Sequence, residues 1–287
     1  MSEIVYLNGT RVAPAEACVP IGDRGFLFGD AVYEVLRAYA GRLWAAERHF
    51  QRLERSLREV ELMGGDVAAL AALAARAVVE SEFGEASVYL HITRGVEPRR
   101  LGGGEGLTPT VLLQVRDMAT IVSAHFLEGV PAITYPDLRW KRCDIKSTNL
   151  LGNALARMAA RRAGVYEAIL VDEEGCITEA AAMGVFGAQG GVLYATPLGP
   201  EILPSISREF LVEIARDLGI GVRLERVTRK RLAGMEEVLL TSTSHEVCPV
   251  TELDGAPVGA GVSGPLGKRL YAAFRARIEA GDDAPRA

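Results

Sequence analysis

The chain has 287 residues, of which 49% are hydrophobic and 24% are charged, and its formal net charge is −5. This is the composition of a globular protein that is long enough for one large domain or two smaller ones. The negative balance gives no general electrostatic attraction to nucleic acid. The most apolar segment, residues 67–79, contains Arg76 and is too short to span a bilayer. Neither a nucleic-acid-binding protein nor a membrane protein is therefore expected.

The four cysteines, Cys18, Cys143, Cys176 and Cys248, stand apart from one another and from any histidine at metal-ligand spacing. This pattern argues against a metal site or a disulfide framework, and it fits a reducing compartment. The sequence does not begin with a basic stretch followed by an apolar run, so no secretory signal is expected. These features together predict a cytoplasmic protein.

Short strands and helices alternate in the first half of the chain. Residues 4–7 and 11–12 flank Asn8-Gly9, a pair whose tolerance of positive φ predicts a hairpin turn. Further strands are expected at 31–39, 87–93 and 110–115, and helices at 47–62 and 66–83, the second of them ending at Gly84. A linker at 119–123 is expected to separate an N-terminal α/β domain, residues 1–118, from a C-terminal domain, residues 124–287.

Two groups of arginines in the first half are candidate anion ligands. Arg52 lies beside the apolar stripe of its predicted helix, where it either covers apolar neighbours with its stem or offers its guanidinium to phosphate oxygens. Arg99 and Arg100 lie in a glycine-rich loop, residues 96–104, where solvated charge is as good an interpretation as anion binding. Tyr33 is expected at the edge of a core strand.

The second half contains a lysine, Lys146, followed directly by Ser147, Thr148 and Asn149, each of which can cap a helix. Apolar residues then recur at helical spacing through residues 150–158. A lone lysine is usually a solvated charge, whereas a desolvated lysine becomes a nucleophilic amine that can form a Schiff base. The spacing alone leaves both interpretations open.

Three other features of the second half are individually modest. Glu179 follows an alternating strand, and a lone glutamate at a strand end is usually just exposed. A helix is expected after residues 203–208, and its free N–H groups would form an anion site. Residues 242–244 are a hydroxyl cluster where a strand ends. None of these features identifies a function by itself.

Considered together, these stretches resemble the fold-type IV pyridoxal-phosphate (PLP) aminotransferases, and among them most closely the bacterial D-amino acid aminotransferases. The matching stretches begin at Asp23 (DRGFLFGDAVYEV), Arg48 (RHFQRL), Trp140 (WKRCDIKSTNLLG), Tyr166 (YEAIL), Ile177 (ITE) and Thr241 (TSTS). They follow the family's order and cover almost the whole chain, so they are far more specific than any single motif.

The resemblance implies a two-domain α/β fold in a homodimer, with PLP in the cleft between the domains. It implies that Lys146 forms the Schiff base with the cofactor and then shuttles the substrate proton. It also implies that Glu179 pairs with the pyridine nitrogen and keeps the ring an electron sink. The residues implied to hold the cofactor are Arg52, Ile206 and Ser207 through their amides, Ser242 and Thr243 at the phosphate, and Leu203 against the ring.

The expected substrate pocket departs from the family in two places. Tyr33 and Arg99 match the residues that bind the substrate carboxylate, but Leu101 stands where a histidine is expected, and Arg100 either replaces it or faces solvent. After Glu179 the family's hydroxyl and amide side chains give way to the run AAAMG. This run predicts fewer hydrogen bonds near the cofactor, each worth about 1 kcal/mol, and small apolar walls that suit hydrophobic substrates.

The leading functional hypothesis is transamination between a D-amino acid and a 2-oxo acid such as pyruvate or 2-oxoglutarate. The missing histidine favours an alternative within the class, a branched-chain L-amino acid or (R)-amine transaminase. A more distant alternative is an aminodeoxychorismate lyase of the same fold, against which the long match around Lys146 argues. A cofactor-binding scaffold without activity is disfavoured because Lys146 and Glu179 are both present.

Overall fold

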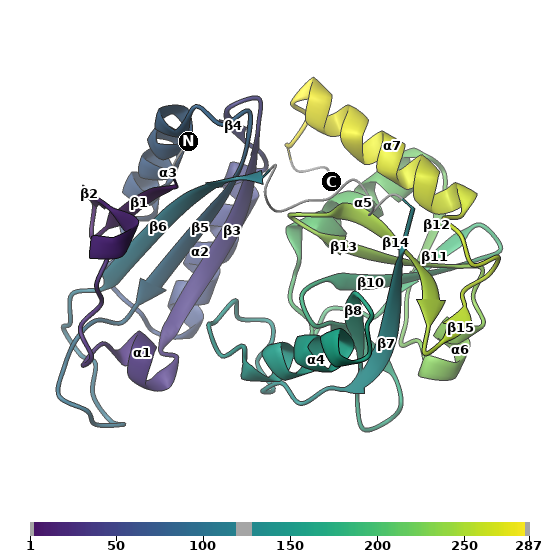
Figure 1. The fold of residues 1–287 in the computed structure, drawn as a ribbon, viewed down its shortest axis with the longest axis horizontal. Coiled ribbons are helices and arrows are strands. Elements are labelled where there is room, and N and C mark those ends of the chain that lie inside the picture. The colour runs from purple at the N-terminus through teal and green to yellow at the C-terminus, as the bar shows by residue number, and fades with distance from the viewer. Residues whose placement is uncertain (1–2, 119–127, 285–287) are drawn as a thin grey trace. The chain divides into compact units, whose positions relative to one another are not determined.

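The computed structural model describes residues 3–118 and 128–284. The chain divides into two compact units, the first formed by residues 1–122, 145–149 and 283–285, and the second by residues 123–144, 150–282 and 286–287. Each unit contains one sheet with helices packed on it, so the expected mixed α/β fold is confirmed (Figure 1). The linker expected at 119–123 lies outside the described residues.

The described part of the first unit contains a six-stranded sheet whose neighbouring strands are all antiparallel. In order across the sheet, the strands are β2 (Thr10–Val12), β1 (Ile4–Leu7), β6 (Thr110–Asp117), β5 (Glu85–Thr93), β3 (Ala31–Tyr39) and β4 (Arg42–Leu43). The hairpin predicted from Asn8-Gly9 is confirmed, because β1 pairs with β2 across that turn.

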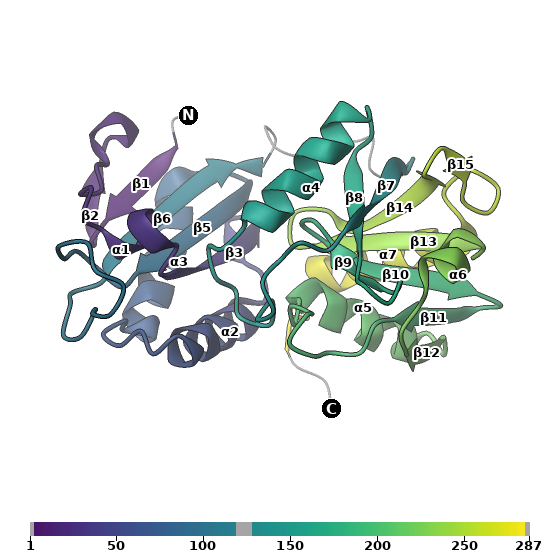
Figure 2. The same ribbon diagram turned by 90° about the horizontal axis from the view of Figure 1, so that it is seen from below.

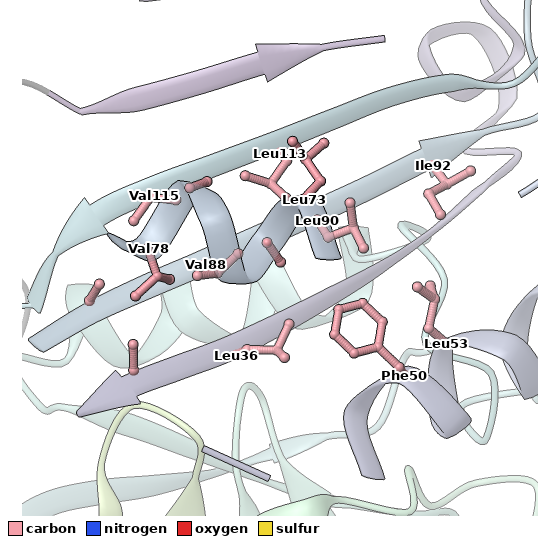
Figure 3. Packing of buried hydrophobic residues seen from close by; sticks show 14 of the residues in the cluster. Leu36, Phe50, Leu53, Leu73, Val78, Val88, Leu90, Ile92, Leu113 and Val115 are labelled. Carbon is pink, nitrogen blue, oxygen red and sulfur yellow. The ribbon is translucent and has the colours of Figure 1, made fainter. Parts of the chain in front are cut away.

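Two amphipathic helices, α2 (Ala46–Glu59) and α3 (Val67–Ser81), lie on one face of this sheet (Figure 2). Two short helices, η1 (Pro14–Glu16) and α1 (Arg24–Phe28), precede β3. Leu36 and Leu90 of the sheet meet Phe50 and Leu53 of α2 in a closed core (Figure 3). Burying each of these side chains contributes about 1.5–3 kcal/mol, so the apolar stripe of α2 fixes the face that the helix turns to the sheet.

The described part of the second unit contains a nine-stranded sheet that mixes parallel and antiparallel pairs. In order, its strands are β12 (Gly221–Leu224), β11 (Val192–Ala195), β10 (Gly184–Gln189), β13 (Glu237–Ser242), β14 (Glu246–Leu253), β7 (Val130–Pro136), β8 (Glu167–Val171) and β9 (Ile177–Ala180), with β15 (Ala256–Pro257) on β14. β7 runs parallel to both of its neighbours. Such pairs need long connections, and helices supply them.

The helices of the second unit are α4 (Leu151–Arg162), α5 (Ile206–Asp217), α6 (Arg229–Ala233) and α7 (Pro265–Ala280). Helix α4 packs on β7 and β8, whereas α5 packs on β13 and α7 on β14. No helix in the described ranges is long and apolar enough to cross a membrane. Residues 3–118 and 128–284 also contain no cluster of three or more His, Cys, Asp or Glu side chains placed to hold a metal ion.

The caps expected at the start of α4 are wrong. The N-cap position of α4 is Leu150, and no side chain caps the helix. Thr148 Oγ1 and Asn149 Nδ2 instead donate to the carbonyl oxygen of Gly29, at 3.3 and 3.4 Å. Gly29 ends α1 in the left-handed conformation, and its carbonyl competes successfully for the hydroxyl and amide that could have capped α4.

Candidate active site

The residues singled out from the sequence fall into both units. The first unit contains Tyr33, Arg52, Arg99, Arg100 and Lys146, and the second contains Glu179, Leu203, Ile206, Ser207, Ser242 and Thr243. The first group contains the proposed amine, the proposed substrate ligands and one proposed phosphate ligand, Arg52, and the second contains the proposed ring ligands and the other phosphate ligands.

Lys146 lies in a five-residue segment, 145–149, that packs against β3 in the first unit. Ile145 is buried in the core of that unit. The amide of Tyr33 donates to the carbonyl oxygen of Lys146 at 3.0 Å, and the amide of Lys146 donates to Ser56 Oγ at 3.3 Å. Hydrogen bonds thus hold both the amide and the carbonyl group of Lys146. Its side chain therefore extends from an ordered segment rather than from an open helical face.

The amine of Lys146 lies over an aromatic surface. Its Nζ is 4.3 Å from the centre of the Tyr33 ring, and the Tyr33 ring is 5.8 Å from that of Tyr89. The Tyr89 hydroxyl lies 3.1 Å from Nδ1 of His91, which pairs with Tyr33 in the sheet register. Burial raises the pKa of Tyr89 to about 12 and lowers the pKa of His91. The surroundings of Lys146 on this face are therefore aromatic and uncharged at neutral pH.

Arg52 forms a buried ion pair on the other face of β3. Its Nε and Nη2 donate to the two carboxylate oxygens of Glu34 at 2.7 and 2.8 Å, and His49 Nδ1 lies 2.8 Å from Glu34 Oε2. Burial alone would raise the pKa of Glu34, but the Arg52 charge and its hydrogen bonds outweigh burial and hold that pKa far below its ordinary value. Burial lowers the pKa of His49. The cluster therefore holds one carboxylate, one guanidinium and a neutral imidazole.

Arg99 and Arg100 differ sharply in their partners. The Arg99 guanidinium lies 5.6 Å from the centre of the Phe28 ring. Arg100 Nε donates to Glu97 Oε2 at 2.9 Å, and its side chain is 68% exposed. The Arg24 guanidinium fastens the same loop by donating to Glu97 at 2.6 Å and to the carbonyl oxygen of Arg100 at 2.9 Å. Arg100 is therefore tied to Glu97 at the surface.

In the second unit, Glu179 is held by an arginine that the sequence reasoning missed. Arg139 Nη1 donates to Glu179 Oε2 at 2.5 Å, and the amide of Leu203 donates to the same oxygen at 3.2 Å. Arg139 also pairs with Asp137 at 2.7 Å, and the Thr178 hydroxyl donates to Asp137 Oδ2 at 2.6 Å. Burial raises the pKa of Asp137, but the Arg139 guanidinium outweighs this effect and leaves that pKa below its ordinary value. Glu179 is thus a fixed, charge-paired carboxylate.

The start of α5 offers backbone donors to an anion. Ile206 and Ser207 are the first two residues of this 12-residue helix, whose first N–H groups have no acceptor within the helix. Ser205 caps the helix by accepting from the amide of Arg208 at 3.4 Å. A Cβ added at Gly184 would lie 4.0 Å from Arg208 Cβ and 3.3 Å from Thr241 Cγ2. The first turn of α5, Gly184 and Thr241 of β13 therefore lie near one another.

Ser242 and Thr243 follow at that end of β13, in the turn to β14. Ser242 Oγ accepts from the amide of His245 at 3.2 Å and lies 3.1 Å from His245 Nδ1. The hydroxyl-bearing residues Ser242 and Thr243 and the N-terminus of α5 thus belong to the same unit. Arg208, also buried at this end of α5, donates to the carbonyl oxygen of Thr196 at 2.8 Å.

The alanine run after Glu179 is mostly part of the core. Ala180 and Ala181 are each 3% exposed and Met183 is 6% exposed. Asn153 of α4 donates to the carbonyl oxygen of Ala181 at 2.7 Å. The small side chains in this run are explained in part by this packing, and Ala182 is the exposed member of the run.

Some missed residues had a signal in the sequence. Glu34 alternates with Tyr33 along β3 and so lies on the core face, in a row with Val32 and Leu36, which are 0% exposed. A charged residue in such a row needs a buried partner, and His49 and Arg52, three residues apart on α2, supply it. Arg139 had no comparable local signal, because its main partner is 40 residues away in sequence.

Comparison with known proteins gives a consistent picture. A family model described as "Amino-transferase class IV" matches residues 31–253. A D-alanine aminotransferase of Bacillus licheniformis is 37% identical over 275 residues, which is 96% of this chain and 96% of that protein. A D-alanine aminotransferase of Staphylococcus aureus (strain COL) is 36% identical over 278 residues, or 96% of this chain and 98% of that protein.

Two solved structures share the fold at lower identity. The branched-chain amino acid aminotransferase of Escherichia coli has a TM-score of 0.90 at 26% identity, covering 95% of this chain and 93% of that chain. A branched-chain amino acid aminotransferase from T.th., complexed with N-(5'-phosphopyridoxyl)-L-glutamate, has a TM-score of 0.89 at 26% identity, covering 96% of this chain and 94% of that chain.

Proposed function

The chain belongs to the class IV aminotransferases, and from this membership we propose that it transfers the amino group of a D-amino acid to a 2-oxo acid such as pyruvate or 2-oxoglutarate, with PLP as its cofactor. One observation carries the proposal. The chain supplies an amine fixed by its backbone, a carboxylate paired with an arginine, and an anion site at a helix start, at Lys146, Glu179 and α5. These are the groups that PLP chemistry requires.

The donor sets fit PLP. A phosphate suits the N–H groups of Ile206 and Ser207, the hydroxyls of Ser242 and Thr243, and the guanidinium of Arg52. Leu203 supplies an apolar contact for the ring. Glu179 would pair with the ring nitrogen and keep a proton on it, and Arg139 orients the carboxylate for this task.

When bound, PLP withdraws electrons from the substrate Cα and so makes its proton removable. Lys146 Nζ would hold the cofactor covalently when no substrate is present, and its amine would carry the proton from and to the substrate Cα. The Tyr33 ring beneath Nζ supports this role, because it holds the amine in a defined position beside β3.

Substrate recognition is proposed for Tyr33 and Arg99, which bind the substrate carboxylate. Arg100 has its charge paired with Glu97, so the geometry favours Arg99 over Arg100 for this role. Sequence relatives named D-alanine aminotransferases, 36–37% identical, favour a D-amino acid. The solved branched-chain enzymes share the fold at 26% identity. Activity on a branched-chain L-amino acid is therefore the alternative that the experiment has to test.

A single-turnover experiment tests the function. The purified holoenzyme is mixed with D-alanine, L-leucine or (R)-1-phenylethylamine, and the cofactor's visible absorbance band is followed. Loss of the band with D-alanine, and its return on adding pyruvate, is the expected result. Loss with L-leucine alone, or with the amine alone, would replace the proposal by the corresponding alternative.

We also infer that the protein acts as a homodimer in the cytoplasm. Leu151, Leu155 and Met158 follow helical spacing along α4 and are 73%, 37% and 53% exposed. An exposed apolar stripe of this kind usually marks an interface, and a second copy of the chain, related by a two-fold axis, would bury it. The four cysteines are free thiols, which suits a reducing compartment.

A further inference from the structure

We propose that Tyr166 and His245 form a hydrogen-bonded relay that aims the Ser242 hydroxyl at the cofactor phosphate. The relay rests on the proposed function, which places Ser242 at the phosphate, and it concerns two residues that have no role in that function. Ser242 ends β13, His245 lies in the turn before β14, and Tyr166 immediately precedes β8. All three lie in the second unit.

The three side chains form one continuous chain of polar contacts. The Tyr166 hydroxyl lies 2.8 Å from His245 Nε2, and His245 Nδ1 lies 3.1 Å from Ser242 Oγ. The rings of Tyr166 and His245 meet edge to face, with centroids 5.9 Å apart. This contact fixes the plane of the imidazole. In that plane Nε2 faces the Tyr166 hydroxyl and Nδ1 faces Ser242 Oγ.

Arg157 sets the direction in which protons are donated along this chain. It forms an ion pair with the buried Glu167 at 2.9 Å, and its Cζ lies 4.8 Å from the centre of the Tyr166 ring. Its Nη1 donates to the backbone carbonyl oxygen of Tyr166 at 2.7 Å. The positive charge beside the Tyr166 ring favours the orientation in which the hydroxyl oxygen turns its lone pairs toward Arg157 and its O–H donates to His245 Nε2.

The tautomer of His245 follows from this direction. A neutral imidazole that accepts at Nε2 carries its proton on Nδ1. The Nδ1–H therefore donates to Ser242 Oγ, which also accepts from the amide of His245 at 3.2 Å. Two donors occupy both acceptor positions of the Ser242 oxygen, so the Ser242 O–H donates outward to a third group.

A phosphate is the acceptor that suits this arrangement. A phosphate dianion offers only acceptors, so Ser242 binds it well only when its own proton points outward. In the opposite tautomer Ser242 would donate to Nδ1 and turn an oxygen lone pair toward the anion. The relay therefore selects the state of Ser242 that binds phosphate, and it acts only through that hydroxyl.

A double-mutant cycle on PLP affinity tests the relay, with affinity measured by absorbance titration of the apoprotein. H245L removes both ring nitrogens, whereas H245N, of the same size as H245L, keeps a donor near the position of Nδ1. We expect S242A and H245L each to weaken PLP binding about 10- to 100-fold, the range for hydrogen bonds to a charged group. H245N should recover most of this loss. Adding H245L to S242A should cost less than about twofold more.

The ³¹P chemical shift of the phosphate in each reconstituted protein reports its hydrogen bonding directly. Y166F keeps the ring contact but loses the donor to Nε2, so it should move the ³¹P shift in the same direction as H245L. Additive losses in the cycle, or a ³¹P shift that H245L leaves unchanged, would overturn the relay. If the wild type is an active transaminase and H245L binds PLP as tightly as the wild type does, the relay is refuted but the proposed function is not. A wild type that binds no PLP refutes both.

Discussion

Arg52 presents its Nε and one terminal nitrogen to the two carboxylate oxygens of Glu34, at 2.7 and 2.8 Å, and both side chains are buried. Removing one partner of a buried ion pair leaves the other charge uncompensated, which typically costs about 3–5 kcal/mol. We expect E34Q to lower the free energy of unfolding in urea by a few kcal/mol, on the order of that range. It should also weaken PLP binding, because Arg52 loses its anchor.

The matched control is E3Q, which removes the exposed Glu3–Arg116 pair, whose side chains are 25% and 55% exposed. Exposed pairs contribute about 0–1 kcal/mol. Equal losses in E34Q and E3Q would contradict the buried-pair account.

The lowered pKa of His49 predicts a loss of stability in mild acid. Burial keeps this imidazole neutral in the folded chain, whereas the unfolded chain takes up a proton as the pH falls below 6.5. The stability that comes from neutral His49 is therefore present above 6.5 and is lost as the pH falls from 6.5 toward the folded pKa. The slope should approach about 1.4 kcal/mol per pH unit.

Urea midpoints measured between about pH 7.5 and about pH 5.5 give this slope. H49Q should flatten it. His91 is a second case with the same sign, because burial also lowers its pKa, so H91Q should remove a separate part of the acid sensitivity. Parallel curves for the wild type and H49Q would show that His49 takes up its proton over the same pH range in the folded and unfolded chains, which would contradict the lowered pKa.

Arg139 is expected to matter to catalysis through Glu179. Its planar fork reaches Glu179 and Asp137 together, a geometry that a lysine ammonium cannot reproduce. We expect R139K to lower kcat for D-alanine by about tenfold or more, equivalent to at least about 1.4 kcal/mol of transition-state stabilisation. R142K changes the exposed Arg142–Asp144 pair and should stay within about twofold of wild type. Similar kcat values for both variants would remove Arg139 from the mechanism.

Substitutions of Arg99 and of Arg100 should have different effects on substrate binding. R99Q removes the proposed carboxylate ligand, and a charge-assisted contact of this kind is worth about 1.5–3 kcal/mol. The kcat/KM for D-alanine should then fall about 10- to 100-fold. R100Q breaks only the surface pair with Glu97 and should change kcat/KM less than about threefold. The reverse ranking would show that Arg100 replaces the missing histidine.

The exposed stripe of α4 predicts the oligomeric state. L151E and M158E place a charge in the proposed dimer interface, and burying an unpaired charge is unfavourable. Each variant should shift the protein from dimer to monomer in size-exclusion chromatography with light scattering. The control is V79E, on the 70%-exposed Val79 of α3, which should leave the mass unchanged. A wild type that is monomeric at micromolar concentration would contradict the dimer.

The sequence predicted the elements whose signals are local. The Asn8-Gly9 hairpin and the buried stripe of α2 both depend on residues a few positions apart, and the structure confirms them. One helix end differs from the prediction. Helix α3 ends at Ser81, ahead of the expected stop at Gly84, because its C-cap Glu82 adopts the left-handed conformation at φ 56° and its amide donates to the carbonyl oxygen of Val79.

Contacts between distant residues could not be predicted in the same way. Nothing near Thr148 and Asn149 reveals that Gly29, about 120 residues earlier, takes their side-chain donors. The parallel pairing of Val130 with Val250 likewise depends on the whole second sheet. For the site, the resemblance supplied Lys146 and Glu179, whereas Arg139 and His245 became visible only when β7, β9 and the turn before β14 were placed.

The segment 145–149 returns to the first unit between two stretches of the second. A fragment ending at residue 122 would lack Ile145, which is 5% exposed in the first core, and the bridge between Ser147 and Val32. A fragment beginning at residue 123 would carry those apolar and pairing groups with nothing to receive them. The first unit is therefore not a separable module, and gene fusions or split versions of this protein need to keep both halves of the polypeptide continuous through Lys146.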